Sequence, residues 1–319
     1  MKLHCAILDD YQHVAMEMAD WSTVKEQVDV QSFSQHFEKE EELLKAINHC
    51  EIIVIMRERT PFTASLFEKL PKLKLLITSG MRNASIDLAA AAAHGVTVCG
   101  TASSSEPPTE LTWALILNLA RKVTEENRAL RENGAWQSTV GTDLHGRTLG
   151  LLGLGKIGSR MAIIAKAFGM NVIAWSQNLT KEQTDQYGVR LANSKEELLV
   201  TSDFVSVHLV LSDRTRGLIG KQELQQMKST AYLINTSRAA IVDQEMLIKA
   251  LREKWIAGAG LDVFDEEPLP ENHSYRTLNN VLATPHLGYV SEINYSTYFK
   301  EAVEDIAAFL KGEAIRKIN

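Results

Sequence analysis

Short apolar runs bounded by polar residues alternate along the chain with segments in which apolar residues recur every three or four positions. The first pattern predicts β-strands and the second predicts amphipathic helices. In the first 100 residues the expected helices are Lys39–Asn48, Ala64–Leu70 and Asp87–His94, the last with Asp87 at its start and Gly95 as its stop. The expected strands are Leu3–Leu8, Val28–Phe33, Ile52–Met56, Leu73–Thr78 and Val96–Cys99. This alternation predicts a parallel sheet with helices on both faces.

A polar stretch over residues 101–108 is followed by a segment that predicts one long helix, from about Thr109 to Arg131. We interpret this region as the crossing into a second domain. A final helix is expected over Glu292–Leu310 and would return to the first domain. The strands of the second domain are expected to begin near Thr148 and to continue at Val172–Trp175, Phe204–Leu209, Tyr232–Asn235, Ala259–Phe264 and Val281–Thr284. Six such strands are typical of a doubly wound nucleotide-binding domain.

Composition narrows the functional classes. A chain of 319 residues is long enough for two domains, and no apolar run approaches the length that spans a membrane. A net charge of −6 without a basic face disfavours binding to nucleic acid. The first ten residues lack the pattern of a signal peptide, so a cytoplasmic location is expected. Cys5, Cys50 and Cys99 show no C-x-x-C spacing, which favours buried reduced thiols over a metal site or a disulfide.

A glycine motif opens the second domain. Gly153, Gly155 and Gly158 form G-x-G-x-x-G between the apolar run that starts at Thr148 and a helical stretch, residues 159–168. The first glycine permits a tight turn, the second permits close approach of a pyrophosphate, and the third permits close packing of helix on strand. A dinucleotide is therefore the expected ligand.

Three later strands of this domain are followed by residues whose side chains can act in catalysis. Arg238 follows the strand ending at Asn235, Glu267 follows the strand ending at Phe264, and His286 follows the strand ending at Thr284. Ligands of open parallel sheets bind at these carboxyl ends. The planar guanidinium of arginine can bind a carboxylate through two hydrogen bonds. Histidine can donate or accept a proton near neutral pH, and a neighbouring carboxylate can orient its ring. The set suits hydride transfer to a 2-keto acid, with Arg238 on the substrate carboxylate, His286 as acid or base, and Glu267 behind His286.

At these residues the sequence resembles the D-isomer-specific 2-hydroxyacid dehydrogenase family. The matching segments are residues 153–158, 235–238, 261–268 and 284–288, in family order and at family-like spacing. The resemblance implies an α/β fold of two doubly wound parallel-sheet domains. It implies a flavodoxin-like substrate domain, residues 1–100 and 288–319, and a Rossmann NAD(P)-binding domain, residues 101–287. It also implies a homodimer that acts on a small 2-keto or 2-hydroxy acid.

The resemblance extends the candidate site beyond Arg238, Glu267 and His286. The loop after Leu73–Thr78 matches the family loop that receives the substrate carboxylate, and Arg57 matches a family arginine that can face the cleft. The expected substrate-binding residues are Arg57, Gly80, Met81, Arg82 and Arg238. The expected cofactor-binding residues are Gly153, Gly155, Lys156, Ile157, Gly158, Trp175, Ser176, His208, Thr215, Thr236, Asp262 and Gly288. No metal is expected.

Three positions depart from the family pattern. Ser176 stands where an acid normally accepts the ribose hydroxyls of NAD, and Lys181 is the nearest cation for a 2′-phosphate. We favour NAD(H) slightly and leave NADP(H) open. Ala239 follows the arginine where glycine is frequent, which predicts ordinary backbone there. Arg82 replaces a second glycine and either reaches the substrate site or pairs outward.

An alternative function keeps the fold and the dinucleotide. The chain would then be a sensor or a corepressor-like scaffold without significant turnover. The intact set of Arg238, Glu267 and His286 weighs against this alternative. Which 2-hydroxy acid is used depends on loop side chains whose geometry the sequence does not give.

Overall fold

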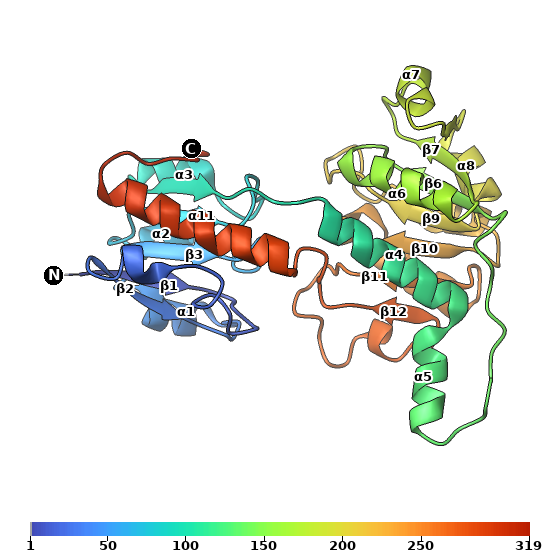
Figure 1. Cartoon of the computed structure of the whole chain (residues 1–319), viewed down its shortest axis with the longest axis horizontal. Helices are drawn as coiled ribbons and strands as arrows, with labels where there is room; N and C mark the ends of the chain where they lie inside the picture. Colours follow the sequence, from blue (N-terminus) through green and yellow to red (C-terminus); the bar gives the residue numbers. More distant parts are fainter. Residues whose placement is uncertain (1) are drawn as a thin grey trace. The chain divides into compact units, whose positions relative to one another are not determined.

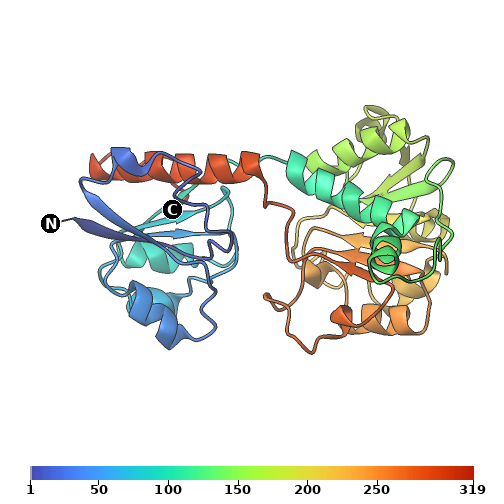
Figure 2. The same cartoon turned by 60° about the horizontal axis from the view of Figure 1, so that its bottom comes forward.

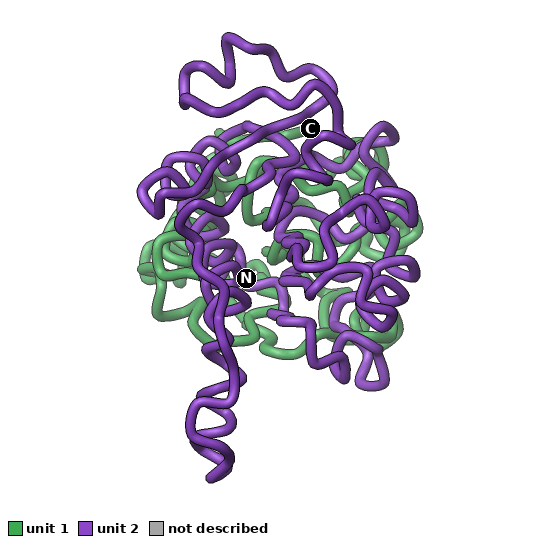
Figure 3. The backbone as a smooth tube through the Cα atoms, turned by 90° about the vertical axis from the view of Figure 1, so that its right-hand side faces the viewer, with its two compact units in different colours: residues 1–104, 291–319 green, residues 105–290 purple. Residues whose placement is uncertain are grey.

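The computed structural model describes residues 2–319. The chain divides into two compact units. Unit 1 comprises the residues up to Ser104 together with Ser291–Asn319, and unit 2 is the continuous stretch Ser105–Val290 (Figure 3). Unit 1 is thus built from both ends of the chain, with unit 2 inserted between them.

Unit 1 contains a five-stranded sheet in the order β2-β1-β3-β4-β5 (Figure 1). Every neighbouring pair is parallel. The buried runs form the central strands because both faces of a parallel sheet are covered. This order is that of flavodoxin-like folds. The strands are β1 (Leu3–Ile7), β2 (Val28–Ser32), β3 (Ile52–Ile55), β4 (Leu75–Thr78) and β5 (Thr97–Gly100).

Helices cover the two faces of this sheet. α1 (Glu40–Ile47), α2 (Ala64–Glu68) and α3 (Leu88–Ala93) lie on one face, and α11 (Glu292–Leu310) lies on the other (Figure 2). The Asp87 side chain accepts a hydrogen bond from the backbone of Ala90, which confirms it as the cap of α3. A short helical turn, η1 (Trp21–Thr23), packs beside α11.

Unit 2 contains a seven-stranded parallel sheet in the order β12-β11-β10-β9-β6-β7-β8. Six strands match the expected ones. The seventh, β8, has two residues and was not predicted, because so short an edge strand leaves no periodic signal. The strands are β6 (Thr148–Leu152), β7 (Asn171–Trp175), β8 (Arg190–Leu191), β9 (Phe204–Val207), β10 (Tyr232–Asn235), β11 (Gly258–Leu261) and β12 (Val281–Ala283).

Two hydrophobic clusters cover the faces of this sheet. One packs α4 (Glu106–Arg121) and α6 (Lys156–Ala167) against the strands. The other uses α8 (Lys195–Thr201), α9 (Lys221–Gln226) and α10 (Gln244–Arg252). The remaining elements are α5 (Val123–Arg131), α7 (Lys181–Asp185), η2 (Ala239–Ile241) and η3 (Ser274–Arg276).

The single long helix expected from Thr109 to Arg131 was wrong in two respects. It breaks into α4 and α5 at Lys122, whose φ of 55° is left-handed. It also begins earlier, at Glu106, because proline is tolerated in the first helical turn, where no backbone donor is needed.

Side-chain burial agrees with the interpretation of the cysteines. Cys5, Cys50 and Cys99 are buried free thiols, and burial raises the pKa of Cys50 and of Cys99 to about 11. In residues 2–319, no helix combines the length and the apolar character that crossing a membrane would require.

Candidate active site

The glycine motif lies at the carboxyl end of β6, between β7 and β9. Gly153 adopts a φ of 102°, and a Cβ there would lie 2.7 Å from the carbonyl oxygen of His208. A Cβ at Gly158 would overlap the carbonyl oxygen of Gly153. Only glycine satisfies either position, so the turn and the helix behind it form one tightly packed unit.

Gly155 differs from the other two glycines of the motif because nothing lies within 4 Å of the place where its Cβ would be. Gly155 is the N-cap of α6 and provides no side-chain hydrogen bond to the helix. The first backbone N–H groups of α6, at Lys156 and Ile157, have no acceptor within the helix. No side chain of Gly155 covers them. This arrangement fits a pyrophosphate, which takes backbone N–H donors and the positive end of a helix dipole.

Other predicted cofactor residues lie at the ends of strands beside this loop. Trp175 is the last residue of β7 and Ser176 follows it, and the Trp175 carbonyl accepts a hydrogen bond from the Gly153 amide at 2.9 Å. His208 follows β9, and its Nε2 lies 2.9 Å from the Ser206 hydroxyl. Burial lowers the pKa of His208 to about 4, so its ring is neutral at physiological pH. Thr215 lies on the next loop, where its hydroxyl donates to the Val210 carbonyl at 2.7 Å.

The loop after β10 is held by its own polar side chains. Asn235 donates through Nδ2 to the Arg238 carbonyl at 3.0 Å and accepts from the Ser237 amide at 3.1 Å. The Arg238 guanidinium donates to the Ser237 carbonyl at 2.8 Å. The Thr236 hydroxyl lies 2.8 Å from that of Thr112 on α4. Ala239 begins η2 with ordinary backbone, as predicted.

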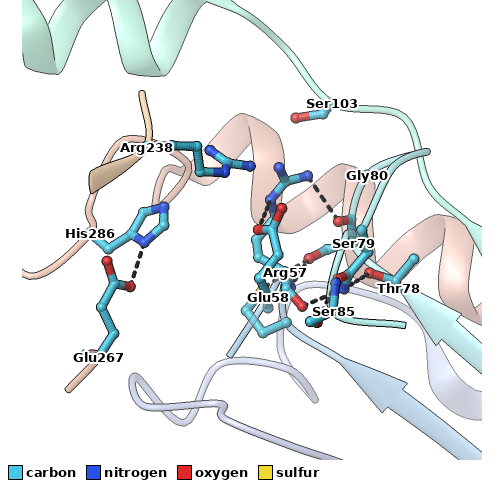
Figure 4. A network of polar contacts seen from close by, with 12 residues as sticks. Arg57, Glu58, Thr78, Ser79, Gly80, Ser85, Ser103, Arg238, Glu267 and His286 are labelled. Atoms are coloured by element: carbon cyan, nitrogen blue, oxygen red, sulfur yellow. Dashed lines mark hydrogen bonds and ion pairs between the residues drawn. The ribbon is translucent and has the colours of Figure 1, made fainter. Parts of the chain in front are cut away.

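Glu267 and His286 form a direct pair (Figure 4). His286 Nδ1 donates to Glu267 Oε2 at 2.6 Å, and Glu267 Oε1 accepts from the Phe264 amide at 2.8 Å. Both carboxylate oxygens are therefore engaged, which fixes the imidazole that they hold. His286 has a left-handed φ of 53°, and its ring lies edge-on to Tyr289 at 5.4 Å. Strained backbone of this kind concentrates at functional sites.

Asp262 accepts hydrogen bonds from the segment that carries His286. Its Oδ1 accepts from the Thr284 hydroxyl at 2.6 Å and from the Leu287 amide at 2.7 Å, and its Oδ2 accepts from the Gly288 amide at 2.8 Å. Burial raises the pKa of Asp262, while these hydrogen bonds act in the opposite direction. Asp262 thus joins the end of β11 to the loop that carries His286.

In unit 1, a second set of predicted residues gathers after β3 and β4. Arg57 has a left-handed φ of 53°, and its Nη1 donates to the Ser79 carbonyl at 3.1 Å (Figure 4). A Cβ on Gly80 would overlap this guanidinium, so glycine at 80 makes room for it. The Gly80 amide donates to the Thr101 hydroxyl at 3.0 Å. Met81 and Arg82 are exposed beyond it.

One cluster in unit 1 was not among the predicted site residues. Asp9, His36 and Thr60 follow β1, β2 and β3, and they are joined by hydrogen bonds through the Asp9 carboxylate. The only sequence signal is a pair of acids, Asp9 and Asp10, directly after a buried strand. His36 lies in a polar loop where no pattern marks it.

Comparison with known proteins identifies the family of this fold. Residues 113–288 match the model of the D-isomer specific 2-hydroxyacid dehydrogenase, NAD binding domain. The chain belongs to this family. As a D-2-hydroxyacid dehydrogenase it transfers hydride between a nicotinamide cofactor and a 2-hydroxy acid/2-keto acid pair, acting on a CH–OH group.

Individual relatives of this dehydrogenase agree with the family assignment. The glyoxylate reductase of Aeropyrum pernix is 41% identical over 78% of this chain and 76% of its own. The D-3-phosphoglycerate dehydrogenase of Methanocaldococcus jannaschii is 36% identical over 87% of this chain, which spans 53% of that enzyme. The phosphoglycerate oxidoreductase of Vibrio cholerae has a solved structure with a TM-score of 0.92 at 36% identity, over 97% of this chain and 99% of its own. The scaffold alternative gains no support from these proteins.

Proposed function

We propose that Arg238, Glu267 and His286 are the catalytic set of a 2-keto acid reductase. The observation that carries this proposal is the 2.6 Å bond between His286 and Glu267, whose second oxygen is fixed by the Phe264 amide. A histidine held in this way keeps one ring nitrogen on the carboxylate and can exchange a proton at Nε2. Arg238 follows β10, and the sheet places β11, the strand before Glu267, between β10 and β12, the strand before His286.

Each side chain then has a distinct task. Arg238 binds the substrate carboxylate through its planar fork of donors and polarises the keto oxygen. His286 Nε2 donates a proton to that oxygen during reduction and removes it during oxidation. Glu267 stabilises the positive charge on His286. The nicotinamide cofactor, when bound, supplies or accepts the hydride.

We propose that the cofactor is NAD(H) and that it binds on the glycine loop, against the residues predicted for it. Ser176 can hydrogen-bond a ribose hydroxyl. Lys181, the nearest cation for a 2′-phosphate, is engaged by Asp185 at 2.7 Å. NADP(H) would therefore have to compete for this lysine, which favours the cofactor without the phosphate.

We further propose that the loop of Gly80, Met81 and Arg82, together with Arg57, binds the carboxylate end of the substrate. The Gly80 amide already donates to Thr101, so the Met81 amide and the Arg57 guanidinium are the donors that this proposal assigns to the substrate. Relatives named glyoxylate reductase support a small 2-keto acid as the substrate.

The proposal is tested by absorbance at the reduced-nicotinamide band. Purified protein is mixed with NADH or NADPH and with 2-keto acids from glyoxylate to phenylpyruvate. Oxidation of NADH by any of them is expected, with NADPH used less well. If both cofactors bind and no 2-keto acid is reduced, the proposed catalytic roles are wrong and the sensor alternative returns.

We also propose a homodimer built on an arm of unit 2. α5 and the segment that follows it extend from the unit (Figure 3), and they expose Leu130, Trp136 and Val140, the last two at 80% and 96%. Large apolar side chains grouped on a surface mark an interaction site. Val140→Glu should shift the sedimentation coefficient to that of a monomer, and Val200→Glu on α8 is the matched control.

We propose that the protein works in a reducing compartment, the cytoplasm. The buried free thiols support this proposal.

A further inference from the structure

A pair of threonine hydroxyls joins α4 to the end of β10. Thr112 lies on α4, which packs against β10 and β11, and Thr236 is the first residue after β10. Their Oγ1 atoms lie 2.8 Å apart. Thr112 is fully buried, whereas Thr236 is partly exposed. Only Thr236 can therefore contact a ligand at the edge of the sheet.

The hydrogen bonds of Thr112 decide which of the two hydroxyls donates. Thr112 Oγ1 also lies 2.6 Å from the Pro108 carbonyl oxygen, which can only accept. A threonine hydroxyl has a single proton, so Thr112 donates that proton to Pro108. Thr112 then has only lone pairs to offer Thr236, and the hydrogen bond between the two hydroxyls uses the proton of Thr236. Thr236 is thereby left as an acceptor toward a ligand.

Thr236 lies beside the proposed catalytic set. Asn235 pairs with Leu261 at the adjoining ends of β10 and β11. Thr236 and Asp262 directly follow these two residues and are therefore neighbours. Arg238 lies two residues beyond Thr236 in the same loop. Because hydride is exchanged at the catalytic set, the nicotinamide end of the cofactor has to lie at this part of the sheet edge.

The carboxamide of the nicotinamide has a group of matching polarity. Its amino group can only donate hydrogen bonds, and its oxygen can only accept them. A ribose hydroxyl can do either, so an acceptor of fixed direction does not select for it. An acceptor held beside the nicotinamide ring does distinguish the carboxamide amino group from any group that carries no proton.

We propose that Thr112 is a positioning residue that holds Thr236 as an acceptor for the amino group of the nicotinamide carboxamide. Thr236 makes the contact, and Thr112 acts only through Thr236. This inference rests on the proposed function, because it places the nicotinamide beside the proposed catalytic set. The protein then binds a dinucleotide that has the carboxamide more tightly than one that lacks the amino group.

Two reduced dinucleotides test the contact. NADH is compared with its 3-acetylpyridine analogue, in which a methyl group replaces the amino group, and Kd is measured for both by isothermal titration calorimetry. In the wild type, the analogue is expected to bind about three- to tenfold more weakly. Thr236→Val keeps the shape of the side chain and removes the acceptor. It should remove most of this preference by weakening the binding of NADH while leaving that of the analogue unchanged.

Variants of α4 separate positioning from packing. Thr112→Val frees the Thr236 proton, so it should lower the preference about twofold or more, and it should add nothing in a Thr236→Val background. Thr112→Ser keeps the hydroxyl and should keep the preference. Thr109→Val is the matched control, because Thr109 is a buried threonine of the same helix whose hydroxyl donates to the Ser105 carbonyl at 2.8 Å. It should also keep the preference.

The outcomes separate this inference from the proposed function. Equal Kd values for the two dinucleotides in the wild type, or an unchanged preference in Thr236→Val or in Thr112→Val, overturn the inference and leave the proposed function intact. If neither dinucleotide binds, the proposed cofactor site itself is wrong. The wild-type comparison and Thr236→Val alter no buried residue, so the inference stays falsifiable even if Thr112→Val folds poorly.

Discussion

Glu267 holds His286 from one side only, with its Oε2 2.6 Å from Nδ1, while the Phe264 amide keeps the other oxygen in place. The two donors to Glu267, the Phe264 amide and His286 Nδ1, follow the adjacent parallel strands β11 and β12. Their separation therefore depends on the register of these strands, in which Ala259 pairs with Val281 and Leu261 pairs with Ala283. The pairing of β11 with β12 therefore sets the orientation of the His286 imidazole.

The first prediction concerns His286 and Glu267. His286→Ala should lower kcat by about 10²–10⁴-fold, because the proton donor is lost. Glu267→Gln should lower kcat less, since the amide oxygen can still orient the ring but carries no charge. Affinity for NADH, measured by fluorescence titration, should stay near the wild-type value in both variants. Loss of NADH binding by a folded His286→Ala variant would contradict the assigned role.

The second prediction separates the charge of Arg238 from its shape. Arg238→Lys keeps the positive charge but removes the planar fork of donors. We expect KM for the 2-keto acid to rise and kcat to fall, with a combined loss of about 10²-fold or more in kcat/KM. Steady-state kinetics with the best substrate provide the measurement. An unchanged kcat/KM would show that Arg238 only stabilises its own loop through Ser237.

The third prediction contrasts two glycines of one motif. Gly155→Ala adds a methyl group where nothing lies within 4 Å, so Tm should stay unchanged while the Kd for NADH rises about tenfold or more. Gly158→Ala places the methyl group against the Gly153 carbonyl and should lower Tm by roughly 2–4 °C or more. Thermal melts and fluorescence titration of both variants test this. Normal NADH binding by Gly155→Ala would contradict the placement of the pyrophosphate.

The fourth prediction concerns Asp305, which is fully buried on α11. Arg316 Nε donates to its Oδ1 at 3.0 Å, and Oδ2 has no hydrogen-bond partner within residues 2–319. Burial raises the pKa of Asp305 to about 7. Because the folded-state pKa lies above the unfolded one, the contribution of Asp305 to stability is present at low pH and is lost as pH rises through about 7.

Asp305→Asn removes this titration. The Tm of the variant relative to wild type should therefore rise between about pH 5 and about pH 8, measured by differential scanning fluorimetry in matched buffers. Other titrating groups are the same in both proteins and cancel in the difference. A constant difference across this range would mean that Asp305 does not titrate there.

Much of this architecture follows from the pattern of apolar residues. Strands such as Ile52–Ile55 are buried on both faces and bounded by polar residues, so their positions were predictable, and with them the edge where Arg238, Glu267 and His286 lie. The break at Lys122 was not predictable, because a left-handed lysine carries no glycine or proline signal. The strand β8 was too short to show a period.

The hydrogen bonds within the two sites do not follow from the sequence. The sequence suggested Asp262 as a cofactor neighbour, and the structure adds that its oxygens accept from Thr284, Leu287 and Gly288. The link between Asp9, His36 and Thr60 spans loops up to 51 residues apart, and only the strand order brings them together. Spacing along a chain does not show which loops meet above a sheet.

The discontinuity of unit 1 bears on how the protein is made. The Val98 amide is bonded to Asn319, 221 positions later, and the Gly100 amide is bonded to the Arg316 carbonyl. On a ribosome, β5 therefore waits for its partner segment until the whole of unit 2 has been synthesised. Unit 2 is continuous and can fold first, whereas the sheet of unit 1 stays without α11 and its last edge contacts until translation of these residues is complete. During that interval the N-terminal strands expose apolar surface and an unpaired edge, and both features favour aggregation.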